Sequence, residues 1–419
     1  MRDLLLWTWG RLGSRPRGDL DLVVEGATTG EMSEAYGNPV GAGFPVWKVG
    51  ELDLALPRRE IKVAAGYRGF RVEVGEVSLA DDLGRRDFTV NSLAYLVGEF
   101  AELPSPARLE QAALEAINRF SPERVYDPFG GVEDLREGVL RAPYPEAFAE
   151  DPVRVLRVAR FAARYGWRID STTLEAARRG AVELSTEPPE RVWGEWEKAC
   201  AHSPSRFLEA LAAAGALRYI RGLEWLSGET PQNNHEENLR EHTLLVLQEG
   251  ENLAAVRDAG VPALTALLFH DRGKVGIVGP HDGEAAARAA AADLKAMKAP
   301  GQVVRMATTW LQVHMAFWGT RRPGRLIEMA GGLAKAGVSP ALAGALALAD
   351  SQGKKNPRPR AEAEARVAQQ ANYLEAALEV MDEIRGDDPR IAALPPTAAR
   401  GEALLSLRAN ALAKKLAGR

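Results

Sequence analysis

Two aspartates lie two residues apart in the stretch Asp-Leu-Asp-Leu-Val-Val at 19–24. If this stretch is a strand, the side chains of Asp19 and Asp21 point to the same side. Such a pair can hold two Mg²⁺ ions against a nucleoside triphosphate, one activating an attacking hydroxyl and one neutralising the departing pyrophosphate. Asp53, in the second strand-like stretch 51–56, would supply a third carboxylate. The alternative is an edge strand with a solvated acidic face, and the pair alone leaves both interpretations open.

A second candidate is the arginine-rich stretch 150–165. Asp151 followed by Pro152 is typical of a helix start, with an N-cap and then proline at the first helical position. At 100° per residue, four arginines fall within about a third of the circumference, and apolar residues fall opposite them. The arginines are Arg154, Arg157, Arg160 and Arg164. The opposite residues are Val155, Val158, Ala159, Ala162 and Tyr165. We therefore expect one face to be core and the other to be a stripe of guanidinium groups.

Asp151 and Arg154 together could read a nucleobase. A carboxylate accepts from an exocyclic amino group, and an arginine donates to an unprotonated ring nitrogen. Cytosine and adenine present that combination, whereas uracil and guanine present the reverse, so the pair would select CTP and ATP without a nucleic-acid template. The alternative is a helix cap followed by solvated arginines, and the two roles are compatible.

A third candidate is the His270-Asp271 pair within the apolar stretch 267–271. Such a pair is difficult to place in a core without a partner. Further residues with metal-binding side chains are His242, His281, His314 and Asp350. Mixed imidazole and carboxylate ligands suit Mn²⁺, Ni²⁺, Zn²⁺ or Fe²⁺. His281 and His314 could support a second metal, or each could be a surface or capping histidine.

These residues need elements to position them. Strand-like stretches lie between residue 19 and about residue 100, separated by glycine and proline. From about residue 105, apolar residues recur at helical spacing, so the sequence predicts a mixed α/β head followed by a long helical body. Linker-like breaks lie at 225–234 and 354–360, and a chain of 419 residues is expected to form two to four domains.

Composition limits the class of protein. The chain is 46% hydrophobic and 26% charged with a formal net charge of −4, so binding to RNA phosphates requires arginines to be concentrated locally. Cys200 is the only cysteine, which excludes an intrachain disulfide and favours a reducing cytoplasm. Apolar runs such as 261–269 are too short to span a bilayer, and the start has no pattern typical of a signal peptide. We expect a cytoplasmic protein with no membrane partner.

Five segments in order resemble motifs of the class II tRNA nucleotidyltransferases (CCA-adding enzymes) and their bacterial poly(A) polymerase relatives. They are Asp19-Leu20-Asp21, Arg85-Arg86-Asp87-Phe88-Thr89-Val90-Asn91-Ser92-Leu93-Ala94-Tyr95, Asp127-Pro128-Phe129-Gly130-Gly131-Val132-Glu133-Asp134-Leu135, Glu150-Asp151-Pro152-Val153-Arg154 and Glu190-Arg191-Val192-Trp193. In that family they are the metal strand, the ribose and triphosphate motif, the hinge motif, the nucleotide-template motif and a neck motif.

The resemblance implies roles for these residues. Asp19 and Asp21 would hold Mg²⁺, with Asp53 as the third catalytic carboxylate. The residues implied in binding ribose and phosphates are Arg2, Arg85, Arg86, Asp87 and Asn91. The residues implied in base reading are Asp151, Arg154 and Arg157. Family members carry a glycine pair before a Val-Arg-Asp segment, whereas this chain begins Met1-Arg2-Asp3, and we expect the natural start to lie upstream.

The histidines resemble those of HD phosphohydrolase domains, where a histidine, a His-Asp pair and a distant aspartate bind one divalent metal. The implied ligands are His242, His270, Asp271 and Asp350. The implied fold is an α/β nucleotidyltransferase head, like the palm of DNA polymerase β, followed by an all-α neck and body and an α-helical HD domain. The expected bounds are 1–103 for the head, 104–225 for the neck and body, 226–360 for the HD domain and 361–419 for a helical tail.

The expected function is template-independent addition of C, A or both to the 3′ end of tRNA from CTP and ATP. The loop at 59–81 is of full length, which favours competence for A addition. A poly(A) polymerase would use the same chemistry, but the tail after Lys354 is short and weakly basic. The remaining alternative is an HD phosphohydrolase whose nucleotidyltransferase half is degenerate. The sequence predicts no oligomeric state.

Overall fold

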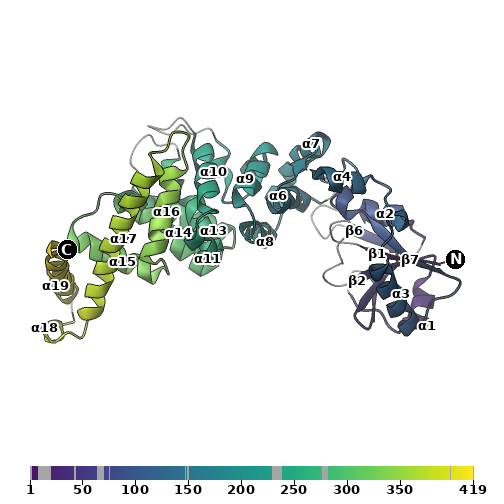
Figure 1. The fold of residues 1–419 in the computed structure, drawn as a ribbon, viewed down its shortest axis with the longest axis horizontal. Coiled ribbons are helices and arrows are strands. Elements are labelled where there is room, and N and C mark those ends of the chain that lie inside the picture. The colour runs from purple at the N-terminus through teal and green to yellow at the C-terminus, as the bar shows by residue number, and fades with distance from the viewer. Residues whose placement is uncertain are drawn as a thin grey trace. The chain divides into compact units, whose positions relative to one another are not determined.

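The structure is a computed structural model that describes residues 2–7, 20–41, 44–63, 70–74, 76–146, 148, 151–228, 238–275, 282–396 and 398–418. Only the backbone is described for residues 2–7, 20, 62, 70 and 117. The chain divides into two compact units, residues 1–187 and 188–419 (Figure 1). The four domain bounds expected from the sequence are finer than this division and stay predictions.

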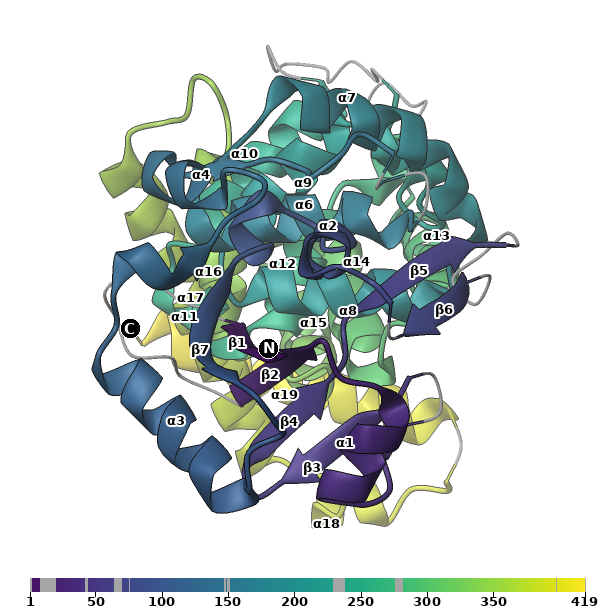
Figure 2. The same cartoon turned by 90° about the vertical axis from the view of Figure 1, so that its right-hand side faces the viewer.

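The first unit is built on a six-stranded sheet in the order β3-β4-β2-β1-β7-β8. The strands are β1 (Arg2–Trp7), β2 (Leu20–Glu25), β3 (Val46–Val49), β4 (Leu52–Ala55), β7 (Ala94–Phe100) and β8 (Val125–Tyr126). Only the β2–β4 pairing is parallel. A hairpin of β5 (Arg58–Lys62) and β6 (Phe70–Val74) lies apart from this sheet (Figure 2). The short parallel pair β9 (Val139–Leu140) and β10 (Arg168–Ile169) is also separate from it.

Alternation along β2 divides the head into two layers. Leu22 and Val24 join the larger core, which includes Trp47 and Leu54. Val23 joins a smaller cluster on the other face. Because side chains alternate with a period of two, Asp21 lies on the Val23 face. The strand predicted at 19–24 is therefore confirmed from Leu20 onward, and Asp19 lies outside the described residues.

Helices cover both faces of the sheet and continue beyond it. The head helices are α1 (Thr29–Tyr36), α2 (Leu79–Gly84) and α3 (Pro106–Asn118), with a 3₁₀ turn at Thr89–Asn91. They are followed by α4 (Gly131–Glu137), α6 (Val153–Tyr165) and α7 (Ser171–Gly180), with 3₁₀ turns at Pro122–Arg124 and Ala181–Thr186. Buried leucines Leu79 and Leu83 hold α2 against the Val23 face, so the residues after α2 lie on the same side of the sheet as Asp21.

The described residues of the second unit contain helices and no strand. The helices are α8 (Pro189–Cys200), α9 (Pro204–Ala213), α10 (Leu239–Gly250), α11 (Ala254–Ala259), α12 (Val261–Phe269), α13 (Gly283–Ala296), α14 (Gly301–Phe317), α15 (Pro323–Lys335), α16 (Pro340–Gln352), α17 (Arg360–Glu383), α18 (Pro389–Ala392) and α19 (Ala398–Ala417). The 3₁₀ turns are Ala216–Tyr219, Glu224–Leu226 and Arg272–Lys274. The predicted change from an α/β head to a helical body is confirmed.

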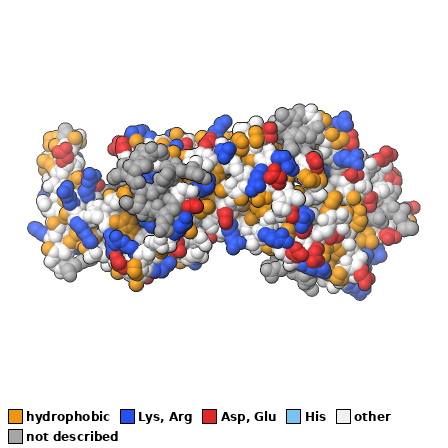
Figure 3. All heavy atoms as spheres, turned by 90° about the horizontal axis from the view of Figure 1, so that it is seen from above, with side chains coloured by type: hydrophobic (Ala, Val, Ile, Leu, Met, Phe, Trp, Pro, Cys, Tyr) orange, Lys and Arg blue, Asp and Glu red, His pale blue; other side chains and the backbone are white. Residues whose placement is uncertain are grey.

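Helix α12 is the centre of the second unit. Every residue from Ala263 to Phe269 is buried, because α10, α14 and α16 all pack against this short apolar helix. The outer helices α17 and α19 pack on α15 and on each other. Among the described residues, no single helix has the length and apolar character to cross a membrane, and the bent pair α15 and α16 meets that test by length and composition alone. On the face drawn in Figure 3, basic and acidic side chains are intermixed.

Candidate nucleotide and metal sites

Two of the three aspartates expected to bind Mg²⁺, Asp21 and Asp53, lie on neighbouring strands. Asp21 on β2 pairs in parallel register with Asp53 on β4. Neighbouring strands are about 4.8 Å apart and residues in register share a face, so both carboxylates belong to the Val23 face. Lys48 Nζ lies 2.5 Å from Asp53 Oδ1. The arrangement places two carboxylates next to each other, with Lys48 offsetting the charge of Asp53, and carboxylate oxygens are the protein ligands that Mg²⁺ binds.

A cluster of arginines faces these aspartates. Arg85 and Arg86 follow α2 directly. Burial of the Arg86 guanidinium lowers its pKa to about 10. The charge of Arg85 also lowers this pKa, whereas the charges of Asp82 and Asp21 raise it. Arg86 therefore stays charged at neutral pH. Arg58 on β5 is partly buried, and desolvation together with the charge of Arg85 lowers its pKa.

Two carboxylates hold this arginine cluster in place. The buried Asp82 Oδ1 accepts from Arg85 Nε at 3.0 Å and from the backbone N–H of Arg58 at 3.1 Å. Glu60 Oε1 accepts from Arg58 Nε at 3.1 Å. Three guanidinium groups on one small loop and hairpin repel one another, so the local chemistry favours a polyanion such as a triphosphate. The sequence analysis did not identify Arg58 and Asp82, which directly precede and follow the loop at 59–81.

Asp87 connects this loop to helix α6. Its Oδ2 accepts from Arg157 Nε at 2.6 Å and lies 2.5 Å from Arg157 Nη2, while its Oδ1 lies 3.5 Å from Arg154 Nε. Arg154 Nη2 also donates to the backbone carbonyl of Arg85. The structure thus brings the expected ribose and phosphate loop together with two of the expected base-reading residues.

The alternative interpretation of α6, a face of solvated arginines, is wrong for Arg154 and Arg160. Arg154 is 7% exposed and Arg160 is 8% exposed, because this face of the helix packs inside the first unit rather than against solvent. Arg164, in the last turn, is exposed, as predicted. Tyr165, expected in the core, is 38% exposed because the helix ends at Gly166, where φ is +70°.

The helix start also differs slightly from the prediction. Helix α6 begins at Val153, and Pro152 rather than Asp151 occupies the N-cap position. The Asp151 carboxylate still accepts from the Val153 backbone N–H at 3.3 Å, so its capping contact is present. Asn91 lies in the 3₁₀ turn after the loop, and its carbonyl oxygen accepts from Arg86 Nη1 at 3.4 Å. The side chain of Arg2 is outside the described part of the structure.

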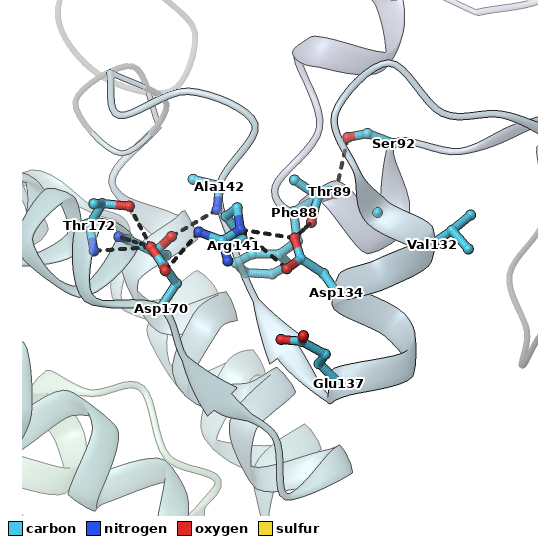
Figure 4. Close-up of polar contacts among 12 residues, drawn as sticks. Phe88, Thr89, Ser92, Val132, Asp134, Glu137, Arg141, Ala142, Asp170 and Thr172 are labelled. Carbon is cyan, nitrogen blue, oxygen red and sulfur yellow. Dashed lines mark hydrogen bonds and ion pairs between the residues drawn. The ribbon is translucent and has the colours of Figure 1, made fainter.

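A polar bridge that the sequence did not predict connects the loop at 85–91 to the helices after it. Thr89 Oγ1 donates to Asp134 Oδ2 at 2.7 Å, and Arg141 Nε donates to Asp134 at 3.1 and 3.2 Å. Arg141 Nη1 then donates to Asp170 Oδ1 at 2.8 Å. Figure 4 shows Arg141 between the two aspartates. Asp134 was part of the hinge motif, but nothing in the sequence linked it to Arg141 or Asp170.

Hydrogen bonds also hold the second end of this bridge. Asp170 accepts from the backbone N–H groups of Thr172 and Thr173 at 3.0 and 3.2 Å, at the start of α7. Burial alone raises the pKa of Asp170, but these hydrogen bonds and the Arg141 charge hold it below its usual value. The bridge therefore ties the loop at 85–91 to α4 and α7 through charged side chains.

The second unit contains a buried cluster of histidines and aspartates from four helices. His242 Nε2 lies 3.3 Å from Asp350 Oδ1 and 3.5 Å from Asp271 Oδ2. His270 Nε2 lies 3.7 Å from Asp350 Oδ1 and 3.4 Å from Asp271 Oδ2. His314 Nε2 lies 3.4 Å from Asp271 Oδ1. The structure thus brings together all the histidine and aspartate candidates of this region except His281, which lies outside the described residues.

All three imidazoles are oriented in the same way. His242 Nδ1 lies 2.9 Å from the Gly353 carbonyl oxygen, and His270 Nδ1 and His314 Nδ1 lie 2.7 and 2.8 Å from carbonyl oxygens one turn back in their own helices. A carbonyl can only accept, so each Nδ1 donates to its carbonyl and each Nε2 is directed into the cluster. Metal-binding histidines usually donate their other ring N–H to a carbonyl or carboxylate in this way, which fixes the orientation of the ring.

The donor set fits one divalent transition metal. Ligand atoms of His242, His270 and Asp350 all lie within 4.8 Å of one another. Burial raises the pKa of Asp271 and of Asp350, but neighbouring histidines outweigh it and hold the pKa of both well below the usual value. Lys274 Nζ donates to Asp271 Oδ2 at 2.6 Å, a contact to which the sequence assigned no role.

Comparisons with known proteins agree with this geometry. The model of the poly A polymerase head domain matches residues 2–141. The Multifunctional CCA protein of Halorhodospira halophila is 36% identical over 346 residues, which cover 77% of this chain and 76% of that protein. The Multifunctional CCA protein of Nitrosococcus oceani is 39% identical over 273 residues, covering 63% of this chain and 60% of that protein.

Solved structures share the fold. The complex of a CCA-adding enzyme with CTP superposes with a TM-score of 0.56 at 18% identity, covering 98% of this chain and 87% of that chain. The Thermotoga maritima CCA-adding enzyme complexed with tRNA gives a TM-score of 0.54 at 18% identity, covering 98% of this chain and 87% of that chain. The head-domain match, the relative aligned over three quarters of both chains and the order of the motifs lead to one conclusion: the chain belongs to the family of CCA-adding tRNA nucleotidyltransferases and bacterial poly(A) polymerases.

Proposed function

We propose that this protein adds C and A to the 3′ end of tRNA from CTP and ATP without a template. The observation that supports this most directly is the register pairing of Asp21 with Asp53 on the sheet face that carries Arg86. Family membership supports the same reaction. The chain spans 76% of the length of one curated relative and 60% of the next, so the activity of those whole proteins is a proposal for this one.

We assign the acidic group to Mg²⁺. Asp19, Asp21 and Asp53 would hold the metal, which supplies Lewis-acid activation of the RNA 3′-hydroxyl and neutralises the pyrophosphate. The protein's own contribution is positioning. Arg58, Arg85 and Arg86 would hold the triphosphate against the sheet. Asp82 and Glu60 fix the guanidinium groups of Arg58 and Arg85, and the Asn91 carbonyl accepts from Arg86, so these charges are positioned in advance.

Base selection is assigned to α6. Asp151 would accept from the exocyclic amino group and Arg154 would donate to the ring nitrogen, which favours cytosine and adenine. Arg154 already contacts the carbonyl of Arg85 and lies near Asp87, so its guanidinium is at the nucleotide loop. The RNA would be held through its backbone by helical segments, which predicts binding that weakens steeply with salt.

The reaction is tested with tRNA transcripts that end before CCA, after CC, or after CCA. Each labelled nucleoside triphosphate is supplied separately with Mg²⁺. Incorporation of C and A that stops at CCA supports the proposal, and C alone or A alone would identify a partial enzyme. Continued addition of A would favour a poly(A) polymerase. An absence of incorporation on every transcript would contradict the proposal and favour the alternative in which the metal cluster of the second unit is the main activity.

We propose a second activity for that cluster. His242, His270, Asp271 and Asp350 match the ligand pattern of HD phosphohydrolases, and the presented Nε2 atoms support a divalent metal such as Mn²⁺, Ni²⁺, Zn²⁺ or Fe²⁺. His314, on the opposite oxygen of Asp271, supports a second metal, for which His281 is a further candidate. The chemistry would be hydrolysis of a phosphomonoester or cyclic phosphodiester.

The His270→Ala/Asp271→Ala variant separates the two activities. It should lose metal-dependent phosphatase activity and keep nucleotide addition, because the two groups of residues belong to different compact units. Hydrolysis that is unchanged in this variant would refute the assignment. Glu284→Ala, a substitution at an exposed acidic residue of α13 whose carboxylate lies 3.6 Å from Arg288, is the matched control and should leave both activities unchanged.

A further inference from the structure

The contact between Arg157 and Asp87 is close and charge-assisted, yet both residues were expected to touch the nucleotide. Arg157 Nε and Nη2 lie 2.6 and 2.5 Å from the same carboxylate oxygen, Oδ2 of Asp87. The side chains are only 31% and 14% exposed. A guanidinium has five N–H donors in a fixed fork, and here two of its three nitrogens are directed at Asp87. Arg157 is therefore not presenting that edge to a base.

Asp87 lies between the residues proposed to hold the base and those proposed to hold the triphosphate. Its Oδ1 is 3.5 Å from Arg154 Nε, the proposed base reader, and it directly follows Arg85 and Arg86, the proposed triphosphate holders. In any nucleotide the ribose joins the base to the phosphates. A carboxylate can only accept hydrogen bonds, and the ribose hydroxyls can donate them. Asp87 therefore has the position and the chemistry to accept from a ribose hydroxyl.

Asp87 has no regular element of its own to fix its side chain. It follows the end of α2 and precedes the 3₁₀ turn at Thr89–Asn91. Arg157, seventy residues later in the chain, sits in the middle of α6 and supplies two hydrogen-bond directions to one oxygen. The second oxygen keeps lone pairs for a ligand, since a carboxylate offers about four acceptor positions.

We infer that Arg157 is a positioning residue that orients the Asp87 carboxylate toward the ribose, and so sets the choice of ribonucleotide over deoxyribonucleotide. Base choice then belongs to Asp151 and Arg154 alone. The inference rests on the proposed nucleotidyl transfer and deepens it. It differs from the sequence-based expectation, in which Arg157 was part of the base-reading surface.

The test compares equilibrium dissociation constants for CTP, 2′-deoxy-CTP and UTP, measured by calorimetry with Mg²⁺. The variants are Arg157→Ala, Arg157→Lys, Asp87→Asn and the double variant Arg157→Ala/Asp87→Asn. Arg157→Lys keeps the charge and loses the two-nitrogen contact, so it reports on orientation even where Arg157→Ala folds poorly. Arg164→Ala is the matched control, an exposed arginine two turns later on the same helix whose guanidinium lies over the Tyr165 ring.

The expected result is a preference for CTP over 2′-deoxy-CTP that falls about tenfold or more in Arg157→Ala, Arg157→Lys and Asp87→Asn, the range expected for a hydrogen bond to a charged group. The preference for CTP over UTP should stay the same, and Arg157→Ala should add nothing in the Asp87→Asn background. Arg164→Ala should behave as the unaltered protein.

Three outcomes would overturn the inference. The first is that the variants bind all three nucleotides more weakly by the same factor, which would indicate a purely structural contact. The second is a change in the CTP to UTP preference as large as the change in sugar preference, which describes a base reader. The third is an unaltered protein that binds CTP and 2′-deoxy-CTP equally. Incorporation into tRNA is followed in parallel and reports on the proposed reaction, whereas the ratio of dissociation constants decides the inference by itself.

Discussion

The bridge that Asp134 makes with Thr89 and Arg141 allows a quantitative prediction for Asp134→Ala. Asp134 is 5% exposed and Thr89 is 1% exposed, so the substitution leaves the Thr89 hydroxyl buried without its acceptor, at a cost of about 1–3 kcal/mol. Arg141 is 39% exposed and keeps its hydrogen bond to Asp170. Because solvent screens its charge, loss of the Arg141–Asp134 contact costs about 1 kcal/mol. The expected destabilisation of the first unit is about 2–4 kcal/mol.

Hydrogen–deuterium exchange detected by mass spectrometry measures this locally. The Thr89 amide donates to the Arg141 carbonyl at 2.8 Å, so its protection reports whether the bridge is closed. A loss of 2–4 kcal/mol corresponds to exchange about 30- to 1000-fold faster, since each 1.4 kcal/mol is a factor of ten. Peptides from α9 in the second unit serve as an internal reference that should not change.

Glu133→Ala is the matched control for this prediction. Glu133 is the neighbouring residue on α4, and its only described partner is Arg136 in an ion pair at 3.3 Å in which both side chains are about two-thirds exposed. Surface pairs of this kind contribute about 0–1 kcal/mol. A double-mutant cycle with Thr89→Val should give a coupling of about 1 kcal/mol. If Asp134→Ala exchanged no faster than Glu133→Ala, the bridge would not be the support that its geometry indicates.

Four further predictions follow from other parts of the structure. Added Mn²⁺ or Ni²⁺ should raise the melting temperature of the protein, and His242→Ala should abolish that shift because a presented Nε2 is lost; an unchanged shift in the variant would contradict the site. Hydrogen bonds and the Arg141 charge outweigh burial and lower the pKa of Asp170 in the folded protein. The ionised carboxylate therefore contributes to stability above its unfolded pKa of about 4, and this contribution is lost as pH falls through the lower folded pKa. An acid unfolding midpoint that is the same in Asp170→Asn would contradict this. Burial, with a smaller effect of the Glu197 charge, raises the pKa of the Cys200 thiol, so a thiol reagent at pH 8 should react with the native protein far more slowly than with the unfolded protein. Gly131→Ala would place a Cβ 2.1 Å from the Thr89 carbonyl oxygen and should destabilise the first unit by several times more than Gly194→Ala, where nothing lies within 4 Å, as urea unfolding would measure.

Much of the head could be predicted because the relevant information is local. Alternation with a period of two was enough to expect Asp21 on a strand with a defined face, and β2 has that form. The change from strand-like to helical spacing near residue 105 predicted the change from a sheet to helices. The apolar stretch before His270 predicted a buried helix, and α12 is buried throughout its second half.

What the sequence alone did not determine is which faces meet. The spacing of arginines on α6 was read correctly as one face, but a polar face can pack against solvent or against acidic and carbonyl groups of another element. Only the tertiary structure showed that Asp87 and the Arg85 carbonyl take up Arg157 and Arg154. Helical periodicity describes direction around one axis and carries no information about the neighbour.

At both candidate sites, the same physical reason separates the features that the sequence determined from those that only the tertiary structure decided. The sequence by itself determined the types of residue, their order and the side of their own element on which they lie, because these depend on short-range backbone geometry. The tertiary structure decided that Asp21 lies in register with Asp53, that Arg141 bridges Asp134 and Asp170, and that four helices bring His242, His270, His314 and Asp350 around Asp271. Those contacts join residues that are far apart in the chain, and they exist only because burial of the apolar faces holds the strands and helices against one another.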